Sequence, residues 1–342
     1  MAAYVYDMPC YKPLTAWYAK EINPTGKRSL VFNQKYALQA DDPLEVGCGQ
    51  CAGCRLDRSR QWAIRCLHES QMFENNSFIT LTFSDPELNK REVPDSLDLT
   101  EFQRFMKRLR EDTVQKNPHC RKTNKEAFDQ WQYDNGIRFF HCGEYGEKYG
   151  RPHYHAILFN IEFKDKYLWQ TRNGMRYYRS PTLEKYWPHG MAIIGDVTFE
   201  SAAYVARYIM KKVNGDQAEE HYKKFETLDK QTGELKDPYQ IKPEYTTMSR
   251  RPGIGSKWFE KYKTDVYPSD FITVNGKKIN PPKYYDKLLQ QEDPYLLQDL
   301  KNERVERARE HYDNNTPERL EVRAALLGRR LERLLRHVDM EN

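Results

Sequence analysis

The hydrophobic pattern is clearest between residues 78 and 195, where short apolar runs alternate with polar turns. The run FITLTF at 78–83 is rich in β-branched and aromatic residues and predicts a buried strand. Further strands are predicted at 137–144 (IRFFHCGE), 153–159 (HYHAILF) and 191–195 (MAIIG). The segment 145–152 holds two glycines and a proline, so the strands on either side of it are expected to pair as an antiparallel hairpin.

Apolar residues at helical spacing predict helices at 55–73, 98–110 and 199–213. The second helix has an apolar stripe made of Phe102, Phe105, Met106 and Leu109. Asp98 and Glu101 suit a capping pair, and the basic residues outside the stripe form either a solvated face or a contact with a DNA backbone. The order strand, helix, strand, strand, strand, helix predicts an α+β fold with a central antiparallel β-sheet and flanking helices.

The rest of the chain has weaker patterns, and residues 1–47 and 214–300 are predicted to be irregular. Thr316 and Pro317 suit a helix start. Apolar residues at heptad spacing follow, so this helix either docks on the protein's own core or forms a short coiled coil: Leu320, Ala324, Leu327, Leu331, Leu334 and Val338. We therefore expect an N-terminal segment with a cysteine cluster and helix at 1–75, the α+β core at 76–215, a basic and aromatic wrap at 216–300, and a charged C-terminal helix at 301–342.

The composition adds little to this picture. The 55 lysines and arginines exceed the 50 acidic residues to give a net charge of +5, which is a weak indication of nucleic-acid binding. No apolar stretch approaches the roughly 20 residues of a membrane helix, and the N-terminus does not resemble a signal peptide. We expect an intracellular protein with no membrane partner.

The strand at 153–159 carries the most informative chemical pattern. Alternate strand residues share a face, so His153 and His155 point the same way, about 7 Å apart at Cα. Glu144 lies across the predicted hairpin and can supply a carboxylate, as can Glu147 in the loop. Two imidazoles and one carboxylate leave coordination positions of a six-coordinate ion open for a phosphate oxygen. A His-x-His pair alone is more often structural.

The helix predicted at 199–213 carries a second pattern. Tyr204 and Tyr208 are four residues apart, so they share a face with Lys211. Arg207 and Lys212 add positive charge nearby and could contact DNA. A neighbouring ammonium favours the phenolate form of tyrosine, and a divalent ion makes phosphorus easier to attack. Taken alone, the pair is more typical of amphipathic packing; together with the histidines it favours metal-assisted phosphodiester transfer.

Three cysteines, Cys48, Cys51 and Cys54, have the spacing of metal ligands. The fourth ligand of a tetrahedral site would be Cys66, His68 or Cys10. Zn²⁺ is favoured over an iron–sulfur cluster, and reduced thiols in a tight turn are the alternative. A metal here would stabilise a DNA-binding arm. Cations beside aromatic residues suit single-stranded DNA or a solvated face, and the residues concerned are Arg250, Arg251, Lys257 and Trp258.

Several of these motifs together resemble a known family. PHYH (152–155) is similar to the His-hydrophobe-His motif of the HUH endonucleases, and YVARYIMKK (204–212) to their two-tyrosine motif. FITLTF resembles their first motif, a strand beside the active site. The order of the motifs resembles the rolling-circle replication initiation proteins of gokushovirus-type microviruses, over about residues 48–286. The segments at 48–66 and 265–286 also look like that group.

The resemblance implies that His153, His155 and Glu144 hold Mg²⁺ or Mn²⁺ against a scissile phosphate. One tyrosine would nick the single-stranded viral origin, leaving a 5′-phosphotyrosine and a free 3′-OH. The second tyrosine would act after one round, and strand transfer would close the circle, with Lys211 assisting. Because the chain shows no Walker A loop, host helicase and polymerase would be partners, in the cytoplasm of the infected bacterium. The alternatives are a non-catalytic zinc-dependent nucleic-acid-binding protein and an HUH transposase or relaxase.

Overall fold

The structure is a computed structural model. It describes residues 10–24, 26–119, 121–146, 149–172, 174–207, 217–224, 227–228, 235–236, 238–310 and 312–339. The chain forms two compact units, one made of Met1–Gln61 with Thr264–Asn342 and the other of Trp62–Lys263. Helix α1 (Ala52–Ser70) begins in the first unit and ends in the second.

The larger unit is built on a seven-stranded sheet in the order β14-β5-β6-β4-β9-β8-β7. Every neighbouring pair in this sheet is antiparallel. The predicted strands and their hairpin are confirmed, and so is the coarse α+β class. The strands are β4 (Asn76–Leu81), β5 (Arg138–Tyr145), β6 (Pro152–Phe159), β7 (Tyr167–Arg172), β8 (Met175–Arg179), β9 (Ala192–Gly195) and β14 (Tyr245–Met248).

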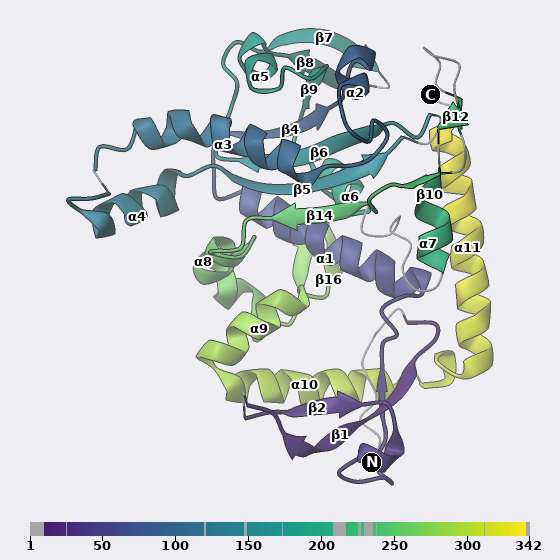
Figure 1. The fold of residues 1–342 in the computed structure, drawn as a ribbon. Helices are drawn as coiled ribbons and strands as arrows, with labels where there is room; N and C mark the ends of the chain where they lie inside the picture. The colour runs from purple at the N-terminus through teal and green to yellow at the C-terminus, as the bar shows by residue number, and fades with distance from the viewer. Residues whose placement is uncertain are drawn as a thin grey trace. The chain divides into compact units, whose positions relative to one another are not determined.

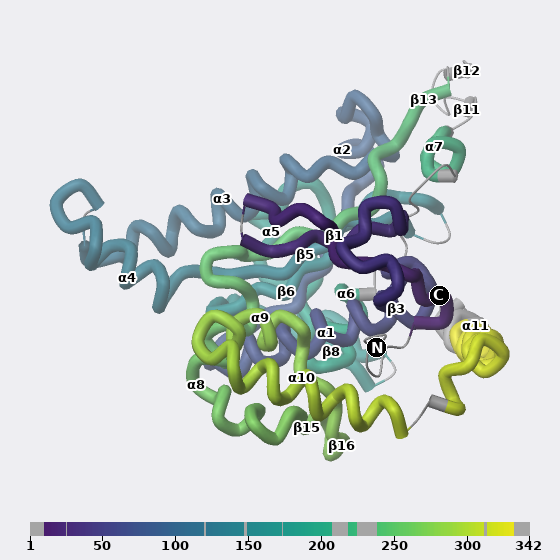
Figure 2. The backbone as a smooth tube through the Cα atoms, turned by 90° about the horizontal axis from the view of Figure 1, so that it is seen from below, coloured from purple at the N-terminus to yellow at the C-terminus, as the bar shows by residue number. Residues whose placement is uncertain are grey.

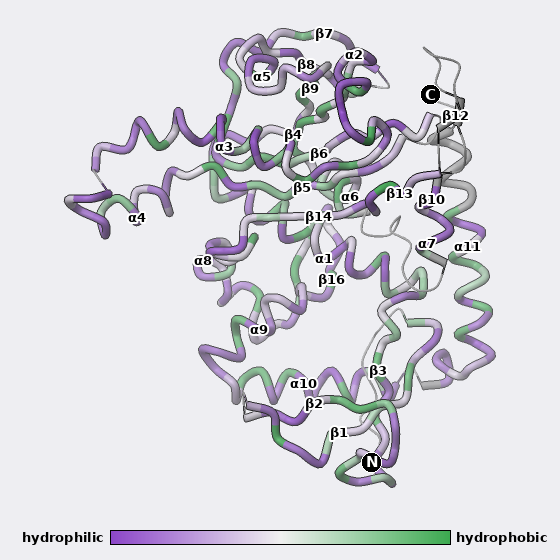
Figure 3. The backbone as a smooth tube through the Cα atoms, viewed as in Figure 1, coloured by the Kyte–Doolittle hydropathy of each residue, from purple (hydrophilic) through white to green (hydrophobic). Residues whose placement is uncertain are grey.

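Helices cover both faces of this sheet (Figure 1). Besides the second part of α1, the helices of the larger unit are α2 (Asp85–Asn89), α3 (Leu99–Gln115), α4 (Lys125–Asn135), α5 (Pro181–Tyr186), α6 (Phe199–Arg207), α7 (Gln217–Tyr222) and the first part of α8 (Ser256–Val266). On one face, Tyr154 and Leu158 of β6 pack with Phe105 of α3. On the other, Ile157 packs with Cys66 of α1 and with α6. Alternate residues of the central strands therefore enter two separate cores, and their hydrophobic positions stand out in Figure 3.

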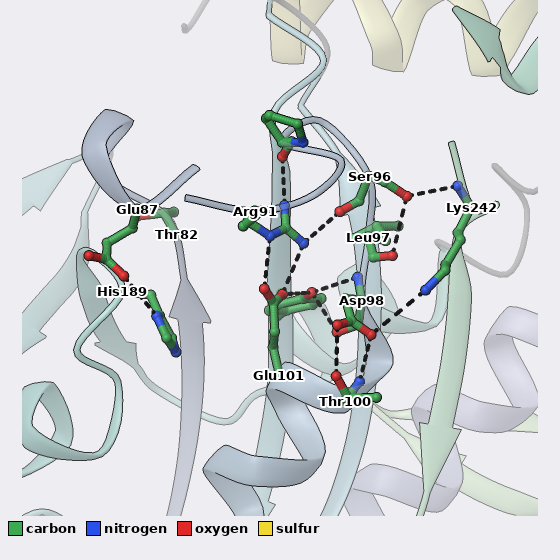
Figure 4. Close-up of polar contacts among 12 residues, drawn as sticks. Thr82, Glu87, Arg91, Ser96, Leu97, Asp98, Thr100, Glu101, His189 and Lys242 are labelled. Atoms are coloured by element: carbon green, nitrogen blue, oxygen red, sulfur yellow. Dashed lines mark hydrogen bonds and ion pairs between the residues drawn. The ribbon is translucent and has the colours of Figure 1, made fainter. Parts of the chain in front are cut away.

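The start of α3 differs in part from the predicted capping pair. The Asp98 side chain caps the helix by accepting a hydrogen bond from the Thr100 amide at 3.0 Å. Glu101 does not complete a capping box. Its carboxylate accepts from Arg91 Nε at 2.8 Å and from the buried Tyr154 hydroxyl at 2.6 Å, which satisfies polar groups that folding removes from water. Figure 4 shows Arg91 joining Glu101 to the loop that ends at Asp98.

The apolar stripe predicted for α3 is buried, and the end of α3 projects with α4 beyond the sheet (Figures 1 and 2). The basic face is used in two ways. Arg104 and Lys107 are exposed, whereas Arg108 and Arg110 donate to backbone carbonyls of the larger unit. Half of that face therefore holds the helix in place, and half is solvated.

The prediction of irregular structure at 1–47 and over much of 214–300 is wrong, because the smaller unit contains regular strands and helices in both ranges. Strand β1 lies between β2 and β3, and β15 pairs with β16 through a turn at Asn275–Gly276. These elements were missed because β1 and β2 lack a regular alternation of buried and exposed positions and α9 buries only Tyr285 and Leu289. The unit contains β1 (Leu14–Ile22), β2 (Arg28–Val31), η1 (Gln34–Tyr36), β3 (Leu44–Val46), β15 (Ile272–Val274), β16 (Lys277–Ile279), α9 (Lys283–Glu292), α10 (Pro294–Arg309), η3 (Tyr312–Asn314) and α11 (Pro317–Asp339).

Helix α11 begins at the predicted proline, and Leu320 of its heptad seam is buried. The remaining regular structure consists of short strand pairs, β10 (Lys223–Lys224) with β13 (Tyr239–Gln240) and β11 (Thr227–Leu228) with β12 (Leu235–Lys236). None of the helices in the described part of the chain is both long enough and apolar enough to span a membrane.

A buried ion pair provides a stability test of the larger unit. The fully buried Glu69 carboxylate pairs with Arg138 and accepts from the Gly255 amide at 2.6 Å. Glu69→Ala leaves a buried guanidinium uncompensated, so we expect the free energy of unfolding to fall by about 3–5 kcal/mol. Asp129→Ala breaks the exposed pair with Lys125 and should cost less than about 1 kcal/mol. Chemical denaturation measures both, and equal losses would contradict the prediction.

Candidate metal centre

The β5–β6 register brings the predicted metal ligands together. Glu144 lies directly opposite His153, and His155 lies between Cys142 of β5 and Thr80 of β4. Residues at alternate positions of neighbouring strands share one face of a sheet, so the carboxylate and both imidazoles converge on one side. This is the face that α6 packs against.

The distances are those of a compact ligand set. Glu144 Oε1 lies 2.6 Å from His153 Nε2 and 2.9 Å from His155 Nε2. Glu144 and His155 are buried, whereas the His153 side chain is 18% exposed. The three ligand atoms lie within 4.8 Å of one another, so a single cation could contact all of them. Because His153 is partly exposed, solvent reaches this side of the ligand set.

The backbone and a hydroxyl orient the two imidazoles. His153 Nδ1 lies 3.1 Å from the Arg151 carbonyl oxygen, which can only accept, so Nδ1 carries hydrogen. His155 Nδ1 lies 2.9 Å from the Thr80 hydroxyl. Each ring therefore directs Nε2 toward Glu144. Such partners on the second nitrogen fix the orientation of metal-binding histidines.

The charge state of Glu144 also suits a cation. Burial raises the pKa of this carboxyl, but the hydrogen bonds from His153 and His155 outweigh burial and lower the pKa to about 2. The carboxylate is therefore ionised at neutral pH. A divalent ion would take the place of the protons between Nε2 and the carboxylate. One carboxylate and two imidazoles, then neutral, would not cancel the charge of the ion, so a positive charge would remain to attract a phosphate.

Tyr204 lies beside the three candidate metal ligands. It lies on α6 with its ring edge-on to His155, at 5.1 Å between ring centroids and an interplanar angle of 88°. Its neighbours Val205 and Ala206 are buried in the core, whereas Tyr204 is 37% exposed. The predicted Tyr208, Lys211 and Lys212 lie outside the described residues, as do Glu147 and the side chain of Arg207.

The residues predicted to contact DNA from 250 to 258 do not share one environment. Lys257 lies over the Tyr133 ring at 3.8 Å, and burial lowers its pKa. Trp258 stacks on His68 at 3.5 Å and donates to Gln71, so one face of the indole is already covered. The exposed Arg250 and Arg251 line a cavity of about 440 Å³.

Of the three residues that the sequence offers as fourth member of the cysteine cluster, Cys10 is the one that lies beside the other three. The structure groups Cys48, Cys51 and Cys54 with Cys10, and the four sulfurs lie within 4.8 Å of one another. Cys66 follows Cys54 by twelve residues on α1, or about 18 Å of helix, and it is fully buried in the sheet core. His68, the other alternative, is buried against Trp258, and burial lowers its pKa to about 3.

Thr80 is a site residue that the sequence reasoning missed. The signal was present, because this hydroxyl interrupts the apolar run 78–83 on the face shared with His155. Thr80→Val keeps the shape of the side chain but removes the contact with His155 Nδ1. We expect metal affinity to fall about 10- to 100-fold. Thr247→Val is the matched control, because its hydroxyl contacts His141 on the other face of the sheet. Calorimetric Mn²⁺ titration of both variants checks this, and equal affinities would contradict it.

The fold and the site define a class: an α+β protein whose antiparallel sheet carries a His-His-Glu ligand set beside a tyrosine. Over residues 76–213 the chain matches the family model of the replication-associated protein ORF2. It is 32% identical over 280 residues to Replication-associated protein VP4 of Bdellovibrio phage phiMH2K, covering 81% of this chain and 76% of the relative. It is 30% identical over 283 residues to Replication-associated protein ORF2 of Spiroplasma virus 4, covering 80% and 76%.

The chain therefore belongs to the family of phage replication-associated proteins. A more distant relative, Replication-associated protein ORF4 of Chlamydia phage 1, is 26% identical over 247 residues, covering 71% of this chain and 53% of the relative. No solved structure matches the chain. The matched range 76–213 contains all three ligands of the candidate metal centre and Tyr204.

Proposed function

We propose that this protein is an HUH-type endonuclease that starts rolling-circle replication of a phage genome, as in the gokushovirus-type microviruses. The observation that carries the proposal is the position of Tyr204, edge-on to His155 beside the Glu144 carboxylate. This arrangement would place a tyrosine nucleophile next to a bound cation on one face of the sheet. The substrate would be the single-stranded viral origin.

The residues fit a resident Mg²⁺ or Mn²⁺. His153 and His155 would supply nitrogen ligands and Glu144 an ionised oxygen, with the ring orientations already set by Arg151 and Thr80. A bound divalent ion supplies positive charge beside the scissile phosphate and makes phosphorus easier to attack. The chain's own contribution is to orient the ligands and to present the tyrosine.

In the nicking step, the oxygen of one tyrosine, Tyr204 or Tyr208, forms a bond to phosphorus and the bond from phosphorus to the 3′-oxygen breaks. The phenol proton passes to solvent, which in the case of Tyr204 reaches the partly exposed side chain, and the leaving 3′-oxygen takes up a proton. The products are a 5′-phosphotyrosine and a free 3′-OH. Host helicase and polymerase would then unwind the duplex and extend the 3′ end.

In the closing step, the other tyrosine of the pair cuts the regenerated origin. The freed 3′-OH attacks the first phosphotyrosine, so one phosphodiester forms as the tyrosine–phosphorus bond breaks. Lys211 would favour the phenolate form of its neighbours. The energy of the cleaved phosphodiester bond is kept in the phosphotyrosine link, so joining the DNA ends needs no nucleotide cofactor. The reaction would take place in the cytoplasm of the infected bacterium.

The test is the covalent adduct itself. Purified protein is incubated with labelled single-stranded viral genome fragments in Mn²⁺ or in EDTA and run on a denaturing gel. We expect an adduct in Mn²⁺ alone. Trypsin cleaves after Arg207, so Tyr204 and Tyr208 fall on different peptides and mass spectrometry identifies the attacked residue. DNA retained under native conditions without any adduct would favour a non-catalytic binding protein and overturn the proposal.

A further inference from the structure

The function proposed above does not use the four-cysteine cluster of the smaller unit. Cys10 precedes β1, Cys48 and Cys51 lie between β3 and α1, and Cys54 is in the first turn of α1. We propose that these four thiolates bind one structural Zn²⁺. The residues come from two parts of the chain, Cys10 and the stretch 48–54, which are 38 residues apart, yet their sulfurs lie within 4.8 Å of one another.

The sulfur spacing fits a single tetrahedral ion. With zinc–sulfur bonds of about 2.3 Å, tetrahedral geometry places sulfurs about 3.8 Å apart. Cys51 Sγ lies 4.0 Å from Cys10 Sγ. A disulfide would need a separation of about 2.05 Å, and all four cysteines are free. An iron–sulfur cluster would divide the four thiolates among two or four iron atoms, which holds sulfurs on different irons farther apart.

Backbone amides are already directed at the sulfurs. The Cys48 amide donates to Cys10 Sγ at 3.3 Å, the Cys51 amide to Cys48 Sγ at 3.2 Å, and the Tyr11 amide to Cys51 Sγ at 3.4 Å. Such donors stabilise thiolate charge around a metal. Gly49 has a φ of +72°, which lets the chain turn tightly between the first two thiols.

The smaller unit also needs such a cross-link. Its three-stranded sheet buries Ala16 completely but leaves much apolar surface exposed, namely Leu14, Tyr18, Ile22, Leu30 and Phe32. A sheet with so small a core is the kind that natural proteins supplement with a metal. Zinc here would tie the segment before β1 and the end of β3 to the start of α1.

The test is the metal content of the full-length chain, measured by mass spectrometry after dialysis. The His153→Ala, His155→Ala background removes the other ligand group, so zinc bound there does not contribute. We expect one zinc per chain in this background, retention of that zinc in the added variant Cys66→Ala, and its loss in the added variant Cys10→Ala. The Cys10/Cys66 pair is matched, because both changes remove a buried thiol.

Three results would overturn the proposal: no stoichiometric metal, iron with visible absorption, or equal zinc loss in both cysteine variants. If Cys10→Ala does not fold, the same question is put to the protein with all its cysteines intact. A mercurial thiol reagent should then release one zinc per chain in step with thiol modification, and a chromogenic chelator measures the released zinc. Release without thiol modification would equally overturn it. None of these readouts depends on DNA cleavage.

Discussion

The His153→Ala, His155→Ala double variant is expected to lose metal-dependent DNA cleavage by roughly 10³-fold or more, because a catalytic metal contributes several kcal/mol to the transition state. Both nitrogen ligands disappear at once. Glu144 loses the two partners that hold its pKa low, so burial becomes the remaining influence and raises the pKa of that carboxyl. The variant thus loses part of the negative charge of the site as well. Binding of single-stranded DNA should persist, because phosphate contacts come from basic residues elsewhere.

His189→Ala is the matched control for this prediction. His189 is partly exposed and contacts Glu87 at 3.2 Å, so it belongs to a surface pair and not to the ligand set. Cleavage is measured with labelled origin DNA in Mn²⁺, and binding by mobility shift in EDTA. Cleavage retained in the double variant, or lost equally in the control, would show that the metal assignment is wrong.

The core of the candidate site could be predicted because it is local. His153 and His155 share a face through strand period alone, and a single hairpin brings Glu144 opposite. Thr80 was harder to assign, because its strand reaches His155 through a pairing that joins residues 75 apart in sequence. Periodicity shows which face a side chain occupies, but it does not show which strand lies alongside.

The cysteine cluster shows the same limit. Spacing identified Cys48, Cys51 and Cys54 but left the fourth ligand open among Cys66, His68 and Cys10. Because α1 is continuous, each residue after Cys54 lies about 1.5 Å farther along the helix, which separates Cys66 from the cluster. The antiparallel pairing of β1 with β3 in the three-stranded sheet brings Cys10 beside Cys48. That sheet could not be predicted, because its strands lack the apolar alternation that reveals those of the larger unit.

The Tyr204→Phe, Tyr208→Phe double variant is expected to form no covalent adduct, a loss limited only by the sensitivity of the gel. The change removes the two hydroxyls and keeps both rings. The edge-on contact between Tyr204 and His155 survives in phenylalanine, so neither the fold nor the ligand set should change. Metal affinity and DNA binding should therefore match those of the parent protein, which separates loss of the nucleophile from loss of the site.

Tyr295→Phe is the control, because Tyr295 is 84% exposed on α10 and loses the same hydroxyl. The single variants Tyr204→Phe and Tyr208→Phe show how the two tyrosines share the reaction. If the two tyrosines alternate, each single variant should still nick DNA but should fail to release closed circles. Closure needs a second cut by the other tyrosine while the first phosphotyrosine link is still intact. An adduct in the double variant would place the nucleophile elsewhere. Full circle closure in either single variant would mean that one tyrosine is sufficient and that alternation is wrong.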